Sequence, residues 1–163
     1  MSLINELEEL ALATRLKRLG ERLSQDVSKI YKESALDFEA KWYLVLELLS
    51  REKVMGITEI SESLQISHPA VVQFVDQLLA NGLIKTAVDN KDARRRLISL
   101  TPAGKQMHKR IGPILTVIKE ENKKWLAEAS ADLLQILSEL EKSLDERSMF
   151  KRIKIGLLER SDS

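Results

Sequence analysis

Apolar residues recur every three to four positions over long parts of the chain, as they do along one face of an α-helix. The first such stretch, residues 3–33, predicts one long helix, although Gly20 lowers its helical propensity. Residues 39–50 are apolar around most of the helical circumference and predict a central helix. Leucines at a 4-3-4 spacing over residues 131–147, and a shorter repeat of this pattern over 149–159, predict two further helices.

Two shorter helices are expected between these long stretches. Thr58 is placed to cap the first of them. Ser67 is placed to cap the second, in which Pro69 is tolerated because it falls in the first turn. Gly82 then supplies the left-handed position that ends many helices, so the second helix is expected to span residues 67–81.

A β-hairpin is expected after the second short helix. Residues 83–88 and 96–100 are strand candidates, and the turn-rich residues 89–93 connect them. Two helices joined by a tight turn and followed by a hairpin make a winged helix-turn-helix, in which the second helix is the recognition helix.

Thr101 and Pro102 combine a helix cap with a proline in the first turn, and they begin another long helix. Gly112 and Pro113 are expected to kink or interrupt it. The predicted fold is therefore mainly α-helical with a small β-hairpin wing. Its expected parts are an N-terminal dimerisation helix over 1–37, a winged helix-turn-helix DNA-binding lobe over 38–104, and C-terminal dimerisation helices over 105–163.

Composition narrows the classes of function. The chain has 163 residues, of which 44% are hydrophobic and 31% charged, and no apolar run is long enough to cross a membrane. The acidic N-terminal residues do not resemble a signal peptide, so a cytoplasmic protein with no membrane partner is expected. With no cysteine, two histidines and no glycine-rich phosphate loop, the usual catalytic and metal clusters cannot easily be assembled. We expect no enzymatic activity, no metal and no cofactor.

Positive charge is concentrated in one segment. Residues 85–110 carry eight basic and two acidic side chains, a net charge of +6, in a chain whose total is +1. Nucleic-acid affinity needs such a local concentration, because lysines and arginines displace counterions from phosphates. The partner expected from this pattern is double-stranded DNA.

These motifs resemble the MarR family of bacterial transcriptional regulators. Residues 67–84 are similar to the family's recognition helix and the residues after it, and the match extends over residues 58–104. The flanking helices agree with the family only in number and length. The family's wing pattern, Asp-x-Arg followed by Leu-Thr-x-x-Gly, appears at Asp92, Arg94, Leu100, Thr101 and Gly104.

The resemblance implies a homodimer that binds a pseudo-palindromic operator, more often as a repressor than as an activator. It implies that the recognition helix enters the major groove and that the wing arginine enters the minor groove. It also implies, as in many members, release from DNA by a small aromatic or phenolic ligand. Two departures stand out. Val72 occupies a position where relatives usually carry a small hydroxyl residue, and the lack of cysteine excludes switching by thiol oxidation.

Arg94 is the strongest single candidate for a DNA contact, because a narrow minor groove attracts guanidinium groups. Asp92 could hold Arg94 extended through a charge-assisted pair. Arg95 and Arg96 alternate faces on a strand, so each either contacts phosphate or lies on the domain surface. The candidates are Ser67, His68, Pro69, Ala70, Val72 and Gln73 on the recognition helix, and Lys91, Asp92, Arg94, Arg95 and Arg96 on the wing.

Two further groups of residues allow more than one interpretation. Trp42, Tyr43, His108 and Trp125 would suit a flat ligand, but aromatic packing and an exposed helix position for His108 are the favoured interpretations. An apolar stripe on a long helix in a small chain favours dimerisation over packing within one subunit. The dimerisation candidates are Leu12, Leu16, Leu19, Leu133, Leu137, Leu140, Leu144 and Phe150.

Two other functions remain open from the sequence. A winged helix can bind a protein instead of DNA, but three consecutive arginines serve that role poorly. An architectural DNA binder without an effector would share the basic wing.

Overall fold

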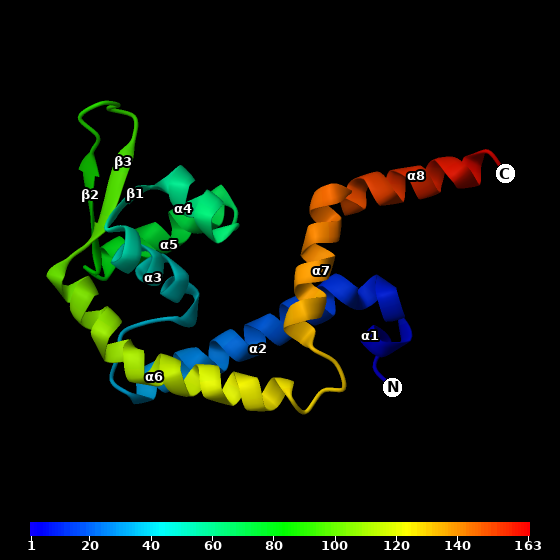
Figure 1. Ribbon diagram of the computed structural model, residues 1–163, viewed down its shortest axis with the longest axis horizontal. Helices are drawn as coiled ribbons and strands as arrows, with labels where there is room; N and C mark the ends of the chain where they lie inside the picture. The colour runs from blue at the N-terminus through cyan, green and yellow to red at the C-terminus, as the bar shows by residue number, and fades with distance from the viewer. The chain divides into compact units, whose positions relative to one another are not determined.

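The computed structural model describes residues 1–163, as helices with one small antiparallel sheet (Figure 1). The chain forms two compact units, residues 1–115 and residues 116–163. No helix is both long enough and apolar enough to cross a lipid bilayer. In chain order, the elements are α1 (Leu3–Glu6), the 3₁₀ helix η1 (Glu8–Ala11), α2 (Leu12–Glu33), the 3₁₀ helix η2 (Ala40–Trp42), α3 (Tyr43–Glu52), β1 (Val54–Gly56), α4 (Ile57–Leu64), α5 (His68–Ala80), β2 (Ile84–Val88), β3 (Arg96–Leu100), α6 (Pro102–Leu126), α7 (Leu133–Glu146) and α8 (Met149–Ser161).

The predicted single helix over residues 3–33 is wrong in its first third. The chain leaves helical geometry after α1, because Glu8 adopts a positive φ of 46°. A short 3₁₀ helix follows, which buries Ala11, and only then does α2 begin. No glycine or proline marks the break in the sequence, and the apolar spacing runs through it unchanged. The pattern alone therefore could not locate it.

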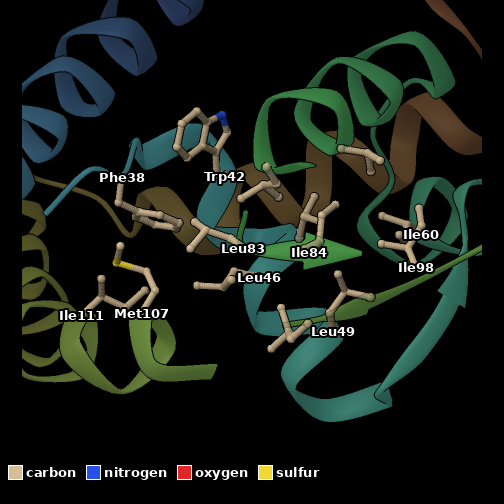
Figure 2. Close-up of a cluster of buried hydrophobic side chains, with 14 of the residues drawn as sticks. Phe38, Trp42, Leu46, Leu49, Ile60, Leu83, Ile84, Ile98, Met107 and Ile111 are labelled. Carbon is tan, nitrogen blue, oxygen red and sulfur yellow. The ribbon is translucent and has the colours of Figure 1, made fainter. Parts of the chain in front are cut away.

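The main core lies in the first unit and joins the end of α2 to the winged lobe. Tyr31 on α2 is 1% exposed and packs edge-to-face on Phe38, which packs in the same way on Trp42. Figure 2 shows Phe38 and Trp42 beside the aliphatic side chains of the lobe. Ile60, Ile98 and Ile111, from α4, β3 and α6, are among its fully buried residues.

The sheet has three strands in the order β1-β3-β2, all antiparallel. The predicted hairpin of β2 and β3 is present, with Ile84 opposite Leu100 and Val88 opposite Arg96. The third strand was not predicted, because β1 has only three residues. It pairs Met55 with Ile98 at the buried centre of β3.

The first helix of the pair begins at a different residue from the one predicted. Gly56, not Thr58, precedes the first turn of α4, and its backbone N–H donates to the Glu59 carboxylate at 3.3 Å. Glu59 satisfies one of the free N–H groups at the helix start, so no hydroxyl cap is needed there. Thr58 lies inside the helix.

The later helices follow the sequence more closely. Thr101 and Pro102 begin α6 as predicted, but the helix runs through Pro113 to Leu126 without the expected interruption. In the second unit, Arg152 on α8 donates to both the carbonyl oxygen and the hydroxyl of Ser143 on α7, at 2.9 and 2.8 Å. These bonds join α7 to α8.

Candidate nucleic-acid interface

The recognition helix α5 is fixed by its buried face and by its cap. Val71, Val75 and Leu78 are fully buried, which leaves the opposite face to solvent. The Ser67 hydroxyl accepts a hydrogen bond from the backbone N–H of Ala70 at 3.3 Å, as its sequence position predicts. His68, Pro69, Gln73 and Ser67 itself are exposed, while Ala70 and Val72 are half-buried.

The turn before α5 sets the angle between the two helices. Gln65 closes α4 in the left-handed conformation, with a φ of 53°. The Ser61 hydroxyl then donates to the carbonyl oxygen of Ile66 at 2.6 Å, and the Ile66 N–H returns to the Ser61 carbonyl at 3.3 Å. This pair of bonds closes the turn, and it holds the start of α5 in place.

The wing tip presents Arg94 to solvent on an ordered backbone. The Asp92 carboxylate accepts the backbone N–H of Arg94 at 3.0 Å and lies 3.9 Å from its Nε. The Arg94 side chain is 97% exposed, so Asp92 constrains its main chain far more than its guanidinium. The tip therefore offers a cation that can enter a groove without first breaking a strong pair. Figure 1 shows the hairpin of β2 and β3 projecting beyond α4 and α5.

The other two arginines of the wing, Arg95 and Arg96, differ in whether a carboxylate compensates their charge. Arg95 pairs with Glu59 of α4 and lies 3.6 Å from Asp89, so its charge is compensated within the lobe. Arg96 is exposed, opposite Val88 on the hairpin, with no carboxylate partner. Lys91 is also exposed, and its backbone N–H donates to Asp89 at 2.9 Å.

The base of the wing is held by the residues of the Leu-Thr-x-x-Gly motif. Thr101 donates its hydroxyl to Gly82 and accepts the N–H of Gly104 at 3.1 Å. Leu100 is 7% exposed. A Cβ on Gly104 would collide with the backbone of Leu83, so only glycine fits there without a shift. The motif thus attaches the hairpin to the end of α5 and to the start of α6.

The residues predicted as a ligand pocket differ in their exposure. Trp42 is 4% exposed and donates its indole N–H to Gln77 of α5 at 2.6 Å, so it belongs to the core. Tyr43 is half-buried, and burial raises the pKa of its hydroxyl. Trp125 is 40% exposed on α6.

His108 is not the exposed residue that the sequence favoured. Its Nε2 lies 2.7 Å from the Glu47 carboxylate of α3, and its Nδ1 lies 3.5 Å from the hydroxyl of Ser50. Arg51 also bonds Glu47, at 2.7 Å. The hydrogen bond with His108 lowers the pKa of Glu47 below its ordinary value of 4.5, and that with Arg51 adds to this. This cluster ties α3 to α6.

The predicted dimerisation leucines remain largely uncovered within one subunit. On α2, Leu12, Leu16 and Leu19 are 55%, 51% and 37% exposed. On the second unit, Leu140, Leu144 and Phe150 are 56%, 44% and 70% exposed, while Leu133 and Leu137 are half-buried. Exposed apolar stripes are a common feature of interaction surfaces.

Sequence reasoning missed two acidic residues that shape the site. Glu59 stands three residues after Gly56, which is the spacing of a capping box, and this signal could have identified its role at the start of α4. Glu47 lies 61 residues from His108, so no local pattern links them.

Comparison with known proteins agrees with this geometry. Residues 40–95 match the model of the MarR family. None of the curated proteins matches the chain by sequence.

Several solved structures share the fold. The PcaV transcriptional regulator of Streptomyces coelicolor, in complex with its natural ligand, is 21% identical, with 91% of this chain and 99% of that one covered and a TM-score of 0.66. The MepR–DNA complex of S. aureus is 20% identical, with coverages of 82% and 96% and a TM-score of 0.63. A mutant MarR from E. coli, complexed with operator DNA, is 21% identical, with coverages of 88% and 99% and a TM-score of 0.58.

Both the matched segment and the shared fold centre on the winged helix-turn-helix, with its recognition helix and wing. Residues 40–95 therefore resemble the MarR family's domain, and the solved structures show that the chain shares its fold with regulators of that kind.

Proposed function

We propose that this protein is a sequence-specific DNA-binding transcriptional regulator that acts as a homodimer on a pseudo-palindromic operator. The role proposed for it is that of a repressor. The observation that carries the proposal is Arg94, whose 97% exposed side chain stands at the tip of a hairpin with an ordered backbone. The exposed start of α5 supplies a second element for a groove. A guanidinium at a wing tip suits the minor groove of DNA. The exposed start of a recognition helix suits the major groove.

The fold neighbours support the same proposal. Two of them, MepR and a mutant MarR, were solved with DNA, in the latter case operator DNA. A regulator of this kind acts on chromosomal DNA, so the proposed location is the cytoplasm.

Homodimer formation is supported by the uncovered leucines. Two stripes, on α2 and on α7, expose apolar side chains that one subunit does not bury. The α2 stripe is flanked by Arg15, Arg18 and Arg22, while α7 carries Glu139, Glu141 and Asp145. Opposite charges beside apolar stripes favour pairing between copies. In the proposed assignment, residues 1–37 and 105–163 contribute to dimerisation and residues 38–104 bind DNA.

Ligand control is the most specific part of the proposal. PcaV was solved with its natural ligand. Here an open hollow of about 830 Å³ lies between the end of α2 and residues 35–41, where Lys29, Lys32, Lys41 and Phe38 contribute to its lining. Asp37 and Glu39 line the hollow as well, Lys41 pairs with Glu39 at 3.1 Å, and Phe38 is only 3% exposed, so the hollow offers a ligand mixed charges and no open ring face. None of the four residues predicted for a pocket lines this hollow.

The decisive experiment is selection of bound sequences from a random oligonucleotide pool. We expect enrichment of an inverted repeat whose half-sites lie about 34 Å apart, one turn of duplex. Sedimentation should show two subunits on each selected duplex, and a reporter gene carrying the selected site should fall in expression when the protein is present. Binding without enrichment would instead indicate an architectural DNA binder, and no retention on DNA or heparin would favour a protein-binding winged helix.

A further inference from the structure

Arg95 joins the wing to the first helix of the helix-turn-helix. Its guanidinium pairs through Nη2 with Glu59 on α4, and its Nη1 lies 3.6 Å from the Oδ2 of Asp89 in the wing loop. The Asp89 side chain is only 13% exposed, so this end of the bridge is shielded from water. One cation therefore holds two carboxylates from different elements of the lobe.

The backbone closes the same loop. Asp89 donates its N–H to the carbonyl oxygen of Arg95 at 3.0 Å, and Arg95 donates its own N–H to the carbonyl oxygen of Asp92 at 3.0 Å. The bridge thus begins at the residue that ends the turn of the wing, directly after Arg94. A displacement of Arg95 would move the main chain on which Arg94 stands.

Glu59 anchors the other end of the bridge. One carboxylate oxygen pairs with Arg95, and the other accepts the N–H of Gly56 at 3.3 Å at the start of α4. The guanidinium lies against Gly56, where a Cβ would come within 2.9 Å of the Arg95 Nε. Glycine at this position leaves the space that the bridge occupies.

We infer that Arg95 is a positioning residue for DNA binding, which sets the direction of the wing and hence the reach of Arg94 by bridging Glu59 and Asp89. The inference rests on the proposed function. Arg95 does not itself neutralise a phosphate, since its charge already has two partners. The DNA contacts of the wing then come from Arg94, with Arg96 and Lys91 beside it.

Salt dependence separates positioning from phosphate contact. Each cation that neutralises DNA charge, at a phosphate or in the minor groove, adds about one to the slope of log K against log salt. Removal of a positioning residue leaves the Arg94 contact itself in place but raises the cost of ordering the wing, so binding weakens at every salt concentration and the slope stays unchanged. Removal of a contacting residue lowers both affinity and slope.

The experiment measures the affinity of the full-length protein for a selected duplex across a salt series. The variants are Arg95→Ala, Arg95→Lys, Glu59→Gln and Arg94→Ala, with Lys17→Ala as a control that removes one exposed cation from α2. We expect Arg95→Ala and Glu59→Gln each to weaken binding about fivefold with the wild-type slope, and their double variant to lose little more. We expect Arg94→Ala to lower the slope by about one.

A second measurement shows whether the variants still fold. Amide exchange at Asp89 and Arg95 should accelerate in Glu59→Gln while exchange in the core of α5 stays slow. Arg95→Lys keeps a cation beside both carboxylates, so it should bind more tightly than Arg95→Ala. Wild-type affinity in Arg95→Ala, or a slope that falls as it does in Arg94→Ala, would overturn the inference alone. No binding of any duplex by the wild type would overturn the proposed function, and the inference with it.

Discussion

The hydroxyl of Thr101 donates a hydrogen bond to the carbonyl oxygen of Gly82 at 2.6 Å, and so joins the residue before α6 to the turn that ends α5. The Thr101 N–H also bonds Leu83, at 3.1 Å. The hairpin between these residues therefore leaves the lobe and returns to it at one point. This closure gives the wing a fixed base beside the recognition helix.

Gly104→Ala should destabilise the fold by about 1–3 kcal/mol, because the added methyl group overlaps the backbone of Leu83, which cannot move without disturbing the wing base. Urea unfolding measures the loss. The matched control is Gly20→Ala on α2, where nothing lies within 4 Å of the new Cβ. This control should stabilise the helix by about 0.5–1 kcal/mol. Equal stability of the two variants would show that the close approach does not matter.

Arg94→Ala should weaken operator binding by about 1–3 kcal/mol, as expected for loss of one base-directed contact. Arg94→Lys keeps the charge but loses the planar guanidinium, so it should bind more tightly than Arg94→Ala and more weakly than the wild type. Fluorescence anisotropy at physiological salt measures both, with Lys17→Ala as the charge-matched control. The wing assignment is wrong if Arg94→Ala binds DNA as the wild type does.

Trp42→Phe should lower the free energy of unfolding by about 1–2 kcal/mol, since the half-buried side-chain carbonyl group of Gln77 loses the indole N–H at 2.6 Å. Chemical denaturation measures this difference. The double variant with Gln77→Met should lose less than the sum of the two single changes, because both remove one interaction. Strict additivity would mean that the hydrogen bond contributes little.

Glu47→Gln should reduce stability at neutral pH by about 1 kcal/mol, because it removes the charged acceptor of His108 and Arg51. The pKa of Glu47 is lowered in the folded state, so its contribution is present above the ordinary pKa of 4.5 and is lost as the pH falls through the lowered value. The difference between wild type and variant should therefore shrink below pH 4.5. Unfolding curves between neutral and acid pH test this, and a constant difference would contradict it.

Leu140→Glu should weaken dimerisation at least about tenfold, because it places a charge within an apolar stripe without disturbing a buried core position. Sedimentation equilibrium measures the dissociation constant of the dimer. Lys142→Glu, which changes a charge off the stripe, serves as the control. If Leu140→Glu dimerises like this control, the α7 stripe is not the interface.

Much of the lobe could be predicted because its signals are local. Ser67 caps α5, Gly82 ends it with a φ of +69°, and β3 spans Arg96–Leu100 as the strand pattern predicts. Each of these depends on residues within a few positions of one another. Helix caps, left-handed turns and alternating strands can be predicted from the sequence for that reason.

The features that sequence reasoning missed depend on distant contacts. β1 exists because Met55 meets the buried face of β3, over forty residues along the chain. The bridge from Arg95 to Glu59 and the pair of Glu47 with His108 also span long separations. Periodicity reports which face of an element is buried, but it does not report which residue that face meets.

Tyr31 lies at the end of α2, yet it is 1% exposed because it packs among Phe38 and the core of the lobe. Only the last two turns of this 22-residue helix are embedded in this way, and its leucine stripe lies uncovered nearer the N-terminus. The helix is therefore packed firmly against the lobe at its C-terminal end only. Because this end of α2 is anchored in the core of the winged lobe, a tilt of the helix and a movement of α5 are coupled. If two subunits pair through the leucine stripe, as proposed, that tilt sets the distance between their recognition helices.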